Sequence, residues 1–544
     1  MYLGIDIGTS ELKALIMDRQ GEIVASQHAT LSVQRPHPHW AEQDPERWWQ
    51  ACSEVLAALR HQFPQAWAEI RAIGLSGQMH GAVLLDDAGK VLRPCILWND
   101  TRSAPQCERL QTSHPRITDI SGNMIMPGFT LPKLHWVAEH EPDIFSRIDK
   151  VLLPKDYLRW RLTGHFFSEP SDAAGTLWLD VARRDWSDEL LAITGLTRAR
   201  MPELVEGSAI SARLDPTLAS EWGLPAAVAV AGGGGDNAAS AVGVGAVNPG
   251  DAFISLGTSG VIFVVNDRLQ ADPERGVHAF CHALPGRWHQ MSVMLSAASC
   301  LRWLCNLLSV SESQLMEEMA QLSEAQLRSA PVFLPYLSGE RTPHNDPDAA
   351  ASFFNLRHET PRALLGYAVT EGVAFGLADG LKVLGDTTPR IQQCSLTGGG
   401  ARSTLWAQLI ADVLQLPIVT HPASASGALG AARLAWLADG GAEHEVCLKP
   451  PVQARYQPDE TRGAWLQQRL RQRFGAWPAL LVAALVFGLA HFAGGPLLIF
   501  FATLAGLLYG LAWQWSGRLW VATLVHFAFN LTHLLLFTYP VLQR

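Results

Sequence analysis

The same short phrase stands at two places in this chain. Ile-Asp-Ile-Gly-Thr-Ser fills residues 5–10, and Ile-Ser-Leu-Gly-Thr-Ser fills residues 254–259. An alternating apolar run that ends in Gly-Thr-Ser predicts a β-strand entering a tight hairpin, whose N–H groups and hydroxyls can hold phosphate oxygens. Because each copy heads a long stretch of chain, the repeat predicts two related domains facing each other across a nucleotide. Ordinary turn chemistry is the alternative, and it suits one copy better than two.

The two copies differ at one chemically important position. Asp6 stands in the first copy where Ser255 stands in the second. A carboxylate can orient Mg²⁺, commonly through water, whereas a hydroxyl at this place contacts only phosphate. Asp6 is therefore the candidate magnesium residue. The alternative role is an acid that stabilises the turn beside Gly8.

Composition narrows the class of protein. At 544 residues the chain is too long for one ordinary domain, and its 48% hydrophobic residues supply ample core. Its formal net charge is −9, and it has no basic stripe, so nucleic acid is not an expected partner. The eight cysteines form no Cys-x-x-Cys pair, which favours buried thiols in a reducing compartment. The chain starts directly with an apolar strand, so no signal peptide is expected.

Local signals place the expected elements. Strands are expected over 2–7, 12–17, 22–26, 70–76, 91–98, 228–231, 395–397 and 417–420. Helices are expected after the Asp44-Pro45 start, over 130–165, 361–384 and 404–415, and from Gly427. Polar, glycine-flanked residues at strand ends are where α/β proteins place ligand contacts. The candidate binding loops are therefore 77–81, 99–100, 232–237 and 398–403.

Asp236 is the candidate catalytic base. It follows a strand and four glycines and precedes a helix, so it is expected at the mouth of a cleft. Phosphoryl transfer needs an acid near the acceptor hydroxyl and a metal on the phosphates. A simple N-cap of the following helix is the alternative role. The chain has neither a Walker P-loop nor a Gly-x-Gly-x-x-Gly after its first strand, which disfavours those nucleotide-binding folds.

Two further loops have ligand-like chemistry. Met79 and His80, beside Gln78, combine apolar and polar groups as a sugar requires, although a lone histidine is more often structural. The glycines 398–400 follow a strand and precede a helix, which would let an adenine ring or a ribose approach the backbone.

Residues 1 to about 458 resemble the FGGY family of carbohydrate kinases. The Gln-Met-His-Gly phrase at 78–81 is similar to the members that act on xylulose rather than on glycerol. The matching phrases, in chain order, are Asp6–Ser10, Gly77–Gly81, Leu97–Asp100, Gly128–His140, Pro154–Tyr157, Gly233–Ala238, Ser338–His344 and Gly398–Arg402.

This resemblance implies an α/β fold of two actin/hexokinase-like (ribonuclease H-like) domains, 1–246 and 247–458, with ATP and sugar in the cleft between them. It implies ATP-dependent phosphorylation of D-xylulose with Mg²⁺, in which closure of the domains excludes water. Asp236 would take the proton of the 5-hydroxyl, and Asp6 would be an acid important for activity. The other implied contacts are Gln78, Met79, His80, Asp236 and Asn237 with the sugar, Thr9, Ser10, Gly257 and Thr258 with the phosphates, and Gly399 and Gly400 with adenosine.

The end of the chain departs from the average composition. From Gly475 onward there is no Asp, Glu or Lys, and the apolar runs 477–493, 496–516 and 519–542 are each near the ~20 residues that span a bilayer. A basic junction, 459–476, precedes them with four arginines, as is usual on the cytoplasmic side. Three transmembrane helices over 477–544 are therefore expected, tethering a cytoplasmic catalytic part to a lipid bilayer. An unusually apolar core bundle is the alternative.

Residues 462–544 resemble the last part of the CAAX-type (CPBP) intramembrane protease family. Phe487–His491 and His526–Asn530 are similar to its second and third motifs. Its first motif, a Glu-Glu pair three residues before Arg, is out of register here, because Asp459-Glu460 stands one residue before Arg462. The resemblance therefore implies a truncated module without proteolytic activity, joined to a kinase by gene fusion or by a faulty reading frame.

Three rival functions stay open at this point. The chain could be a kinase for another ketose or polyol, a membrane protease with a kinase-like regulatory domain, or a non-catalytic sensor that binds ATP. A homodimer is a further expectation.

Overall fold

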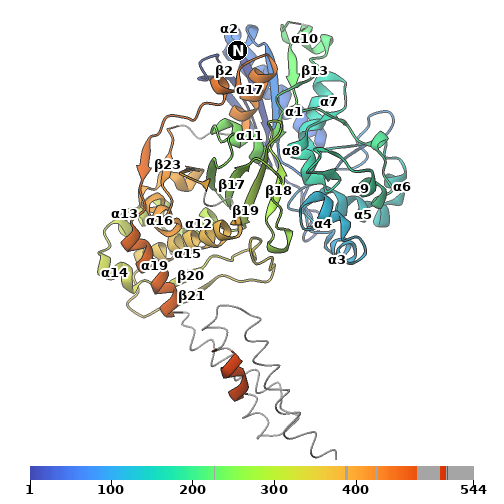
Figure 1. Cartoon of the computed structure of the whole chain (residues 1–544). Helices are drawn as coiled ribbons and strands as arrows, with labels where there is room; N and C mark the ends of the chain where they lie inside the picture. The colour runs from blue at the N-terminus through green and yellow to red at the C-terminus, as the bar shows by residue number, and fades with distance from the viewer. Residues whose placement is uncertain (226, 386–389, 423–426, 474–502, 510, 512–544) are drawn as a thin grey trace, which may run out of the picture. The chain divides into compact units, whose positions relative to one another are not determined.

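The computed structural model describes residues 1–225, 227–385, 390–422, 427–473, 503–509 and 511. The chain divides into two compact units, Met1–Pro458 and Asp459–Arg544. The first unit is built on two mixed seven-stranded sheets (Figure 1).

The first sheet has the strand order β13-β14-β5-β1-β2-β3, and β15 also pairs with β5. Strands β1, β2 and β3 form an antiparallel meander, and β1 is parallel to β5. The bounds are β1 Tyr2–Ile7, β2 Glu11–Met17, β3 Ile23–Thr30, β5 Ala72–Gly77, β13 Ile210–Arg213, β14 Ala229–Ala231 and β15 Gly234–Gly235.

The second sheet has the order β18-β19-β17-β16-β22-β23-β24. Strand β16 is antiparallel to β17 and parallel to β22, as β1 is to β2 and β5, so the two sheets share one plan. The bounds are β16 Ala252–Leu256, β17 Gly260–Asn266, β18 His278–Cys281, β19 Trp288–Met294, β22 Cys394–Thr397, β23 Ile418–Thr420 and β24 Ala454–Tyr456. The two related domains expected from the repeated phrase are therefore confirmed. The boundary between them at 246/247 stays a prediction.

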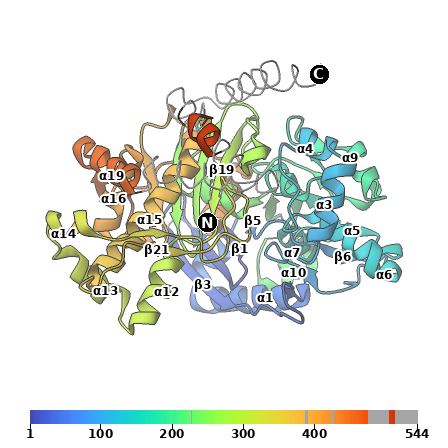
Figure 2. The same ribbon diagram turned by 90° about the horizontal axis from the view of Figure 1, so that it is seen from below.

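Helices α12 to α16 lie on one side of the central strands and helices α3 to α9 on the other in both views (Figures 1 and 2). Helix α1 begins at Pro45 because the Asp44 carboxylate accepts a hydrogen bond from the N–H of Glu46 at 3.0 Å. The first-half helices are α1 Pro45–Gln62, α2 Pro64–Ala68, α3 Ala104–Ser113, α4 Arg116–Ser121, α5 Thr130–His140, α6 Pro142–Ser146, α7 Pro154–Thr163, α8 Pro170–Ala173, α9 Asp188–Ile193, α10 Pro216–Trp222 and α11 Asp236–Gly243. The second-half helices are α12 Ala298–Leu308, α13 Glu312–Ala320, α14 Glu324–Ser329, α15 Arg362–Val383, α16 Thr404–Leu414, α17 Gly427–Ala438 and α18 Glu443–Val446.

Short strands complete the first unit. They pair outside the two large sheets and belong to the connecting segments: β4 Glu42–Gln43, β6 Val83–Leu85, β7 Cys95–Ile96, β8 Lys150–Leu152, β9 Phe167–Ser168, β10 Leu179–Asp180, β11 Asp185–Trp186, β12 Glu203–Leu204, β20 Val332–Leu334 and β21 Ser352–Phe354.

Helix α17, from late in the chain, packs on the first sheet and on α11. A Cβ on Gly4 of β1 or on Gly74 of β5 would collide with the backbone of α17, and one on Gly430 would collide with Ala239 of α11. Small residues at these points let the backbones approach closely, so this second-half helix joins the two halves of the unit.

Two expected elements differ in extent. The expected strand 91–98 is wrong in length, because only Cys95–Ile96 pairs as a strand. The expected helix 130–165 is interrupted by strand β8 and divides into α5, α6 and α7. Pro142 and Pro154 each begin a new helix, because proline cannot continue one from within.

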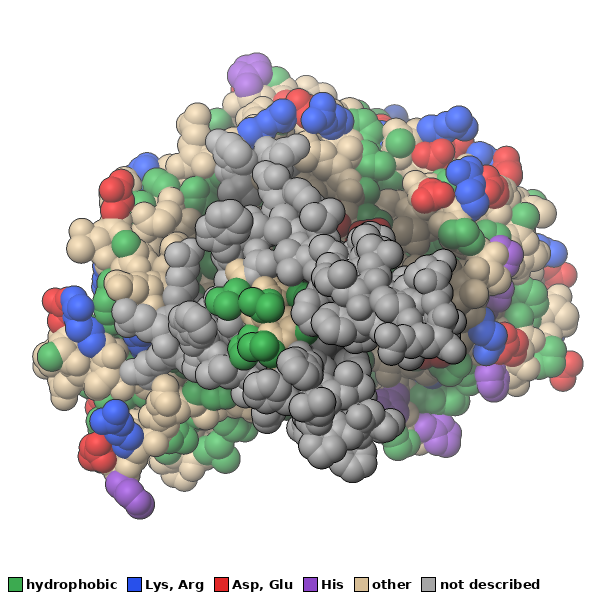
Figure 3. Space-filling view, turned by 60° about the horizontal axis from the view of Figure 1, so that its bottom comes forward, with side chains coloured by type: hydrophobic (Ala, Val, Ile, Leu, Met, Phe, Trp, Pro, Cys, Tyr) green, Lys and Arg blue, Asp and Glu red, His purple; other side chains and the backbone are tan. Residues whose placement is uncertain are grey.

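All eight cysteines are free and buried, as the sequence predicts. On the face shown in Figure 3, blue and red side chains are interspersed around the rim. Such mixing accords with the near balance of 42 basic and 51 acidic residues.

In the second unit, helix α19 spans Glu460–Arg473 within the basic junction. Within the described residues, no helix combines the length and the apolar character that a membrane crossing requires. Nearly all of the predicted spans, with His491, His526 and Asn530, lie outside the described residues.

Candidate active site

The two repeated phrases form the hairpins β1–β2 and β16–β17. In each, the glycine closes the turn: the N–H of Gly8 donates to the carbonyl of Glu11 at 2.9 Å, and that of Gly257 to the carbonyl of Ser259 at 3.0 Å. The predicted phosphate residues Thr9, Ser10 and Thr258 therefore lie at the tips of equivalent hairpins, each beside the central strand of its sheet.

The first hairpin is held from behind by two buried glutamine amides. Gln43 Nε2 donates to the carbonyl of Thr9 at 2.7 Å, and Gln78 Nε2 donates to Gln43 Oε1 at 3.0 Å and to the carbonyl of Gly8 at 3.4 Å. Gln78 Oε1 accepts from the Thr9 hydroxyl at 3.1 Å, and the side chain is 2% exposed. In this arrangement Gln78 positions the hairpin, and its contact with the sugar stays a prediction.

Met79 and His80 lie in the turn that follows strand β5, which ends at Gly77. The Met79 side chain lies against Gly235 and Gly175, and the His80 ring also lies against Gly175. His80 adopts a left-handed backbone with φ 69°, and its carbonyl accepts hydrogen bonds from Lys133 Nζ at 2.8 Å and from the Thr130 hydroxyl at 3.1 Å. These contacts fix the turn that presents the ring.

The His80 ring is neutral and has a defined tautomer. Its Nδ1 lies 2.6 Å from the carbonyl of Gly175, so Nδ1 carries the proton and Nε2 is an acceptor. Burial, more than any neighbouring charge, lowers the pKa of His80 to about 3.

Asp236 is the first residue of α11, directly after the glycine bend. Its Oδ1 accepts hydrogen bonds from the N–H and the Nδ2 of Asn237 at 2.7 and 3.0 Å. Burial, followed by the charge of Asp6, raises the pKa of Asp236 to about 7. A carboxyl with such a pKa exchanges protons readily at neutral pH, as a general base requires.

Asp6 is one strand away from this bend. Its Oδ1 accepts a hydrogen bond from the Ser76 hydroxyl at 2.8 Å, and burial raises the pKa of Asp6. Gly427, the first residue of α17, lies directly over it, since a Cβ there would stand 2.8 Å from the carboxylate. The two acids lie close enough for the charge of Asp6 to raise the pKa of Asp236.

A buried charged cluster supports the bend below Asp236. Arg159 of α7 is inaccessible to solvent, and its guanidinium donates to the carbonyls of Ala231 and Gly232. Lys155, also inaccessible, contacts three carboxylates at 2.8, 3.4 and 2.8 Å. Ser171 Oγ accepts from the N–H of Gly235 at 3.1 Å. The cluster comprises Lys155, Asp156, Arg159, Glu169 and Asp172.

Two of the glycines predicted to contact the nucleotide, Gly257 and Gly399, have open space where a Cβ would stand. Nothing lies closer than 3.7 Å to such an atom on Gly257, or than 3.8 Å on Gly399. By contrast, Gly398 has φ +86°, and a Cβ on Gly400 would collide with Leu256. Packing therefore explains glycine at 398 and 400, whereas at 257 and 399 it leaves room for a ligand to approach the backbone.

The donor set fits ATP with Mg²⁺. Asp6 offers a carboxylate, and the described residues hold no cluster of three or more His, Cys, Asp or Glu that could form a closed metal cage. Mg²⁺ is commonly held by one or two carboxylates together with phosphates and water, so a single acid at the foot of the hairpin predicted to hold phosphate is suitable.

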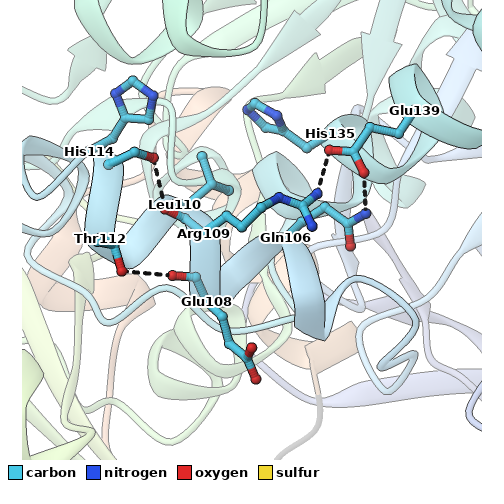
Figure 4. A pocket seen from close by; sticks show the side chains of 9 residues that line it. Gln106, Glu108, Arg109, Leu110, Thr112, His114, His135 and Glu139 are labelled. Atoms are coloured by element: carbon cyan, nitrogen blue, oxygen red, sulfur yellow. Dashed lines mark hydrogen bonds and ion pairs between the residues drawn. The ribbon is translucent and has the colours of Figure 1, made fainter.

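A separate hollow of about 620 Å³ lies between α3 and α5 (Figure 4). Arg109 and Glu139 form an ion pair there at 2.5 Å, and Gln106 donates to the same carboxylate. None of the residues predicted to bind sugar, nucleotide or metal lines it.

The comparisons with known proteins cover both units. Residues 1–243 match the model of the FGGY family of carbohydrate kinases, N-terminal domain, and residues 252–438 match that of its C-terminal domain. The chain belongs to the FGGY family of carbohydrate kinases. Residues 462–532 match a third model, type II CAAX prenyl endopeptidase Rce1-like.

Individual FGGY relatives are similar over most of their length. A protein named xylulose kinase from Escherichia coli K12 is 52% identical over 86% of this chain and 97% of its own. One of the same name from Klebsiella pneumoniae is 50% identical over 85% and 96%. A crystal structure described as a xyloylose kinase from Brucella ovis superposes with a TM-score of 0.84 at 49% identity, covering 88% of this chain and 99% of that one.

Sequence reasoning missed the groups that position the site. Gln43 and Arg159 received no role, although the phrase Pro154–Tyr157 beside Arg159 was part of the resemblance. Their contacts join segments far apart in the chain, and spacing along the sequence holds no signal for such pairings. Nothing in the sequence of α7 singles out Arg159, because the helix also contains Lys155, Asp156 and Arg161.

Proposed function

We propose that this chain transfers the γ-phosphoryl group of ATP to the 5-hydroxyl of D-xylulose. The observation that carries the proposal is the placement of Asp236, with a pKa near 7, on a braced bend beside Asp6 and the Met79–His80 turn. The relatives named xylulose kinase support the choice of sugar.

Asp236 would accept the proton of the sugar hydroxyl. Asn237 donates two hydrogen bonds to Oδ1, and no described residue donates one to the other oxygen, so Oδ2 would be the acceptor. As the hydroxyl oxygen bonds to the γ-phosphorus, the bond from that phosphorus to the β,γ-bridging oxygen breaks, and its electron pair leaves with ADP. The proton on Asp236 then passes to solvent.

The remaining residues orient the reactants. Thr9, Ser10, Gly257 and Thr258 would hold phosphate oxygens through N–H groups and hydroxyls, and Gly399 and Gly400 would border adenosine. Met79 and His80 would contact the sugar together with Asn237. Mg²⁺ held beside Asp6 would supply charge neutralisation on the transferring phosphates.

An ADP-release assay with a panel of sugars tests the proposal. The full chain is expected to release ADP with D-xylulose at a higher kcat/KM than with D-ribulose, xylitol or glycerol. A higher kcat/KM with one of the other sugars would mean that the chain is a kinase for another ketose or polyol. ATP binding without turnover of any sugar would favour a non-catalytic sensor that binds ATP.

We propose, further, that residues 477–544 anchor a kinase that works in the cytoplasm. The absence of Asp, Glu and Lys from Gly475 onward and the Rce1-like match support this. The full chain is expected in the membrane fraction, and a chain ending at residue 461 in the supernatant. A full chain that stays monodisperse in the supernatant would contradict the anchor. The homodimer stays a prediction, which size-exclusion chromatography of the shorter chain tests.

A further inference from the structure

Arg341 is a charged residue of the FGGY-like phrase 338–344 that has no role in the mechanism above. It lies in the segment between β20 and β21, and its side chain is partly buried. Its backbone is well fixed: the N–H of Arg341 donates to Glu340 Oε1 at 2.8 Å, and the next residue, Thr342, donates to the carbonyls of Val293 and Gly276 at 3.1 and 2.9 Å. The backbone from which the guanidinium extends is therefore held in place.

The guanidinium lies at a ring cluster that joins the two halves at the sugar side. Arg341 Nη1 is 3.3 Å from His278 Nε2, and the His278 ring packs on Phe129 with centroids 5.6 Å apart. Phe129 in turn packs edge-on against His80 at 4.7 Å, and Phe280 stacks on His278 at 5.5 Å. His80, Phe129, His278 and Phe280 thus connect the turn after β5 to Arg341.

Among the described residues, Arg341 forms no ion pair with an acidic side chain within 4.0 Å. The neighbouring Glu340 carboxylate accepts from the backbone N–H groups of Leu295 and Arg341 instead. Burial, followed by the charge of Arg341, lowers the pKa of His278 well below its usual value, so His278 is a neutral acceptor for one guanidinium N–H. No described residue accepts a hydrogen bond from the other guanidinium N–H groups, and a partly buried cation without a carboxylate is an arrangement found at functional sites.

The chemistry of the two polar groups here is complementary. A guanidinium only donates hydrogen bonds, and His80 Nε2 only accepts them. A carbonyl oxygen only accepts, and a hydroxyl beside it can donate. The pair therefore matches an α-hydroxyketone, in which a carbonyl and a hydroxyl stand on adjacent carbons.

We propose that Arg341 and His80 together recognise the α-hydroxyketone end of the substrate, with Arg341 donating to the C2 carbonyl and His80 Nε2 accepting from the C1 hydroxyl. This inference rests on the proposed sugar kinase function and adds the basis on which the site selects a 2-ketose. Gly235, the neighbour of Asp236, lies against Met79, and both Met79 and His80 lie against Gly175, so one continuous set of contacts connects the proposed base to the His80 ring.

Variants of Arg341 assayed with a ketose and its matched polyol test the inference. Losing hydrogen bonds from a charged donor to the carbonyl is expected to lower kcat/KM for D-xylulose about 10- to 100-fold in Arg341→Met, mainly through KM. Xylitol, which has no carbonyl, is expected to change by less than about 3-fold, so that the preference for the ketose collapses. Arg341→Lys, which keeps the charge, is expected to lie between.

The control is Arg302→Met, which removes an exposed arginine of the same half that pairs with Glu312 at 3.2 Å. It should leave both sugars unchanged. Equal losses for D-xylulose and xylitol in Arg341→Met, or no loss for either, would overturn the proposal. A wild-type protein without D-xylulose turnover would instead refute the proposed function, so the two failures are distinguishable. An unchanged affinity for ADP in Arg341→Met, measured by calorimetry, establishes that the variant is folded.

Discussion

The two halves of the kinase unit share one sheet plan but use its strand ends differently. After β5, the first half carries large side chains at Met79 and His80, whereas after the equivalent strand β22 the second half carries three glycines. The hairpins also differ in support. Two glutamine amides hold the carbonyls of the first, and backbone N–H groups at the start of α12 hold those of Gly257 and Thr258 at 2.8 and 2.9 Å.

Under the proposed function, this difference would let one duplicated frame serve two ligands. Side chains with defined tautomers and donors would discriminate among sugars, while bare backbone would accommodate a flat nucleotide. Asp6 stands where the second half has Ser255, so at this position only the first half would bring negative charge to the transferring group.

The largest expected effect tests whether the sugar half holds the base. Asp236→Asn is expected to lower sugar-dependent kcat about 10³-fold, because proton removal from the hydroxyl is lost. ADP affinity should be unchanged in calorimetry. The matched control, Asp188→Asn, alters an exposed carboxylate that pairs with Arg198 and should retain full turnover. Turnover within 10-fold of wild type in Asp236→Asn would remove Asp236 from this role.

The next effect concerns the buried charges that brace the sugar half. Lys155→Met leaves three carboxylates without their cation, which is expected to destabilise the fold by about 3–5 kcal/mol and to lower the urea midpoint strongly. Lys449→Met removes a lysine that is 51% exposed and pairs with Asp251, so it should shift the midpoint little. Similar midpoints for both variants would show that the cluster contributes nothing specific.

Substituting the acid of the first hairpin and the serine of the second sharpens the contrast between the two hairpins. Asp6→Asn removes the negative charge that helps to raise the pKa of Asp236 to about 7. Because the base acts deprotonated, activity rises with pH through this pKa, and the variant's rise should move to lower pH while its maximal rate falls about 10²-fold. Ser255→Asp is expected to raise KM for ATP by phosphate repulsion without moving the pH profile. An unchanged pH profile in Asp6→Asn would show that the charge of Asp6 has no effect on the pKa of Asp236.

The smallest effect distinguishes two adjacent glycines of the nucleotide half. Gly399→Ala has room for its methyl group and should raise KM for ATP about 3- to 10-fold with an unchanged melting temperature, since only the ligand meets the new atom. Gly400→Ala should lower the melting temperature instead, because its Cβ would collide with Leu256. An unchanged KM for ATP in Gly399→Ala together with a lowered melting temperature would mean that adenosine does not bind beside Gly399.

The sequence predicted what local chemistry determines. The strand alternation before each Gly-Thr-Ser and the glycine run before Asp236 led directly to both hairpins and to the start of α11. The extents of 91–98 and 130–165 were misjudged, because prolines within an apolar pattern and pairing with distant strands decide them. The role of Gln78 in holding the first hairpin depends on its hydrogen bond to Gln43, which is 35 residues away, and no motif reveals this pairing.

The seat of α17 on the first sheet has a consequence for synthesis. Tyr2, Leu15 and Ala72 of that sheet form a cluster with Ala428, Ala432 and other residues of α17. During synthesis, this face of the sheet stays uncovered until the chain has grown beyond residue 438 and α17 can form. This delay is on the order of tens of seconds. The first half is therefore expected to engage chaperones as a nascent chain, and truncation before α17 should yield aggregates rather than an isolated sugar-binding domain.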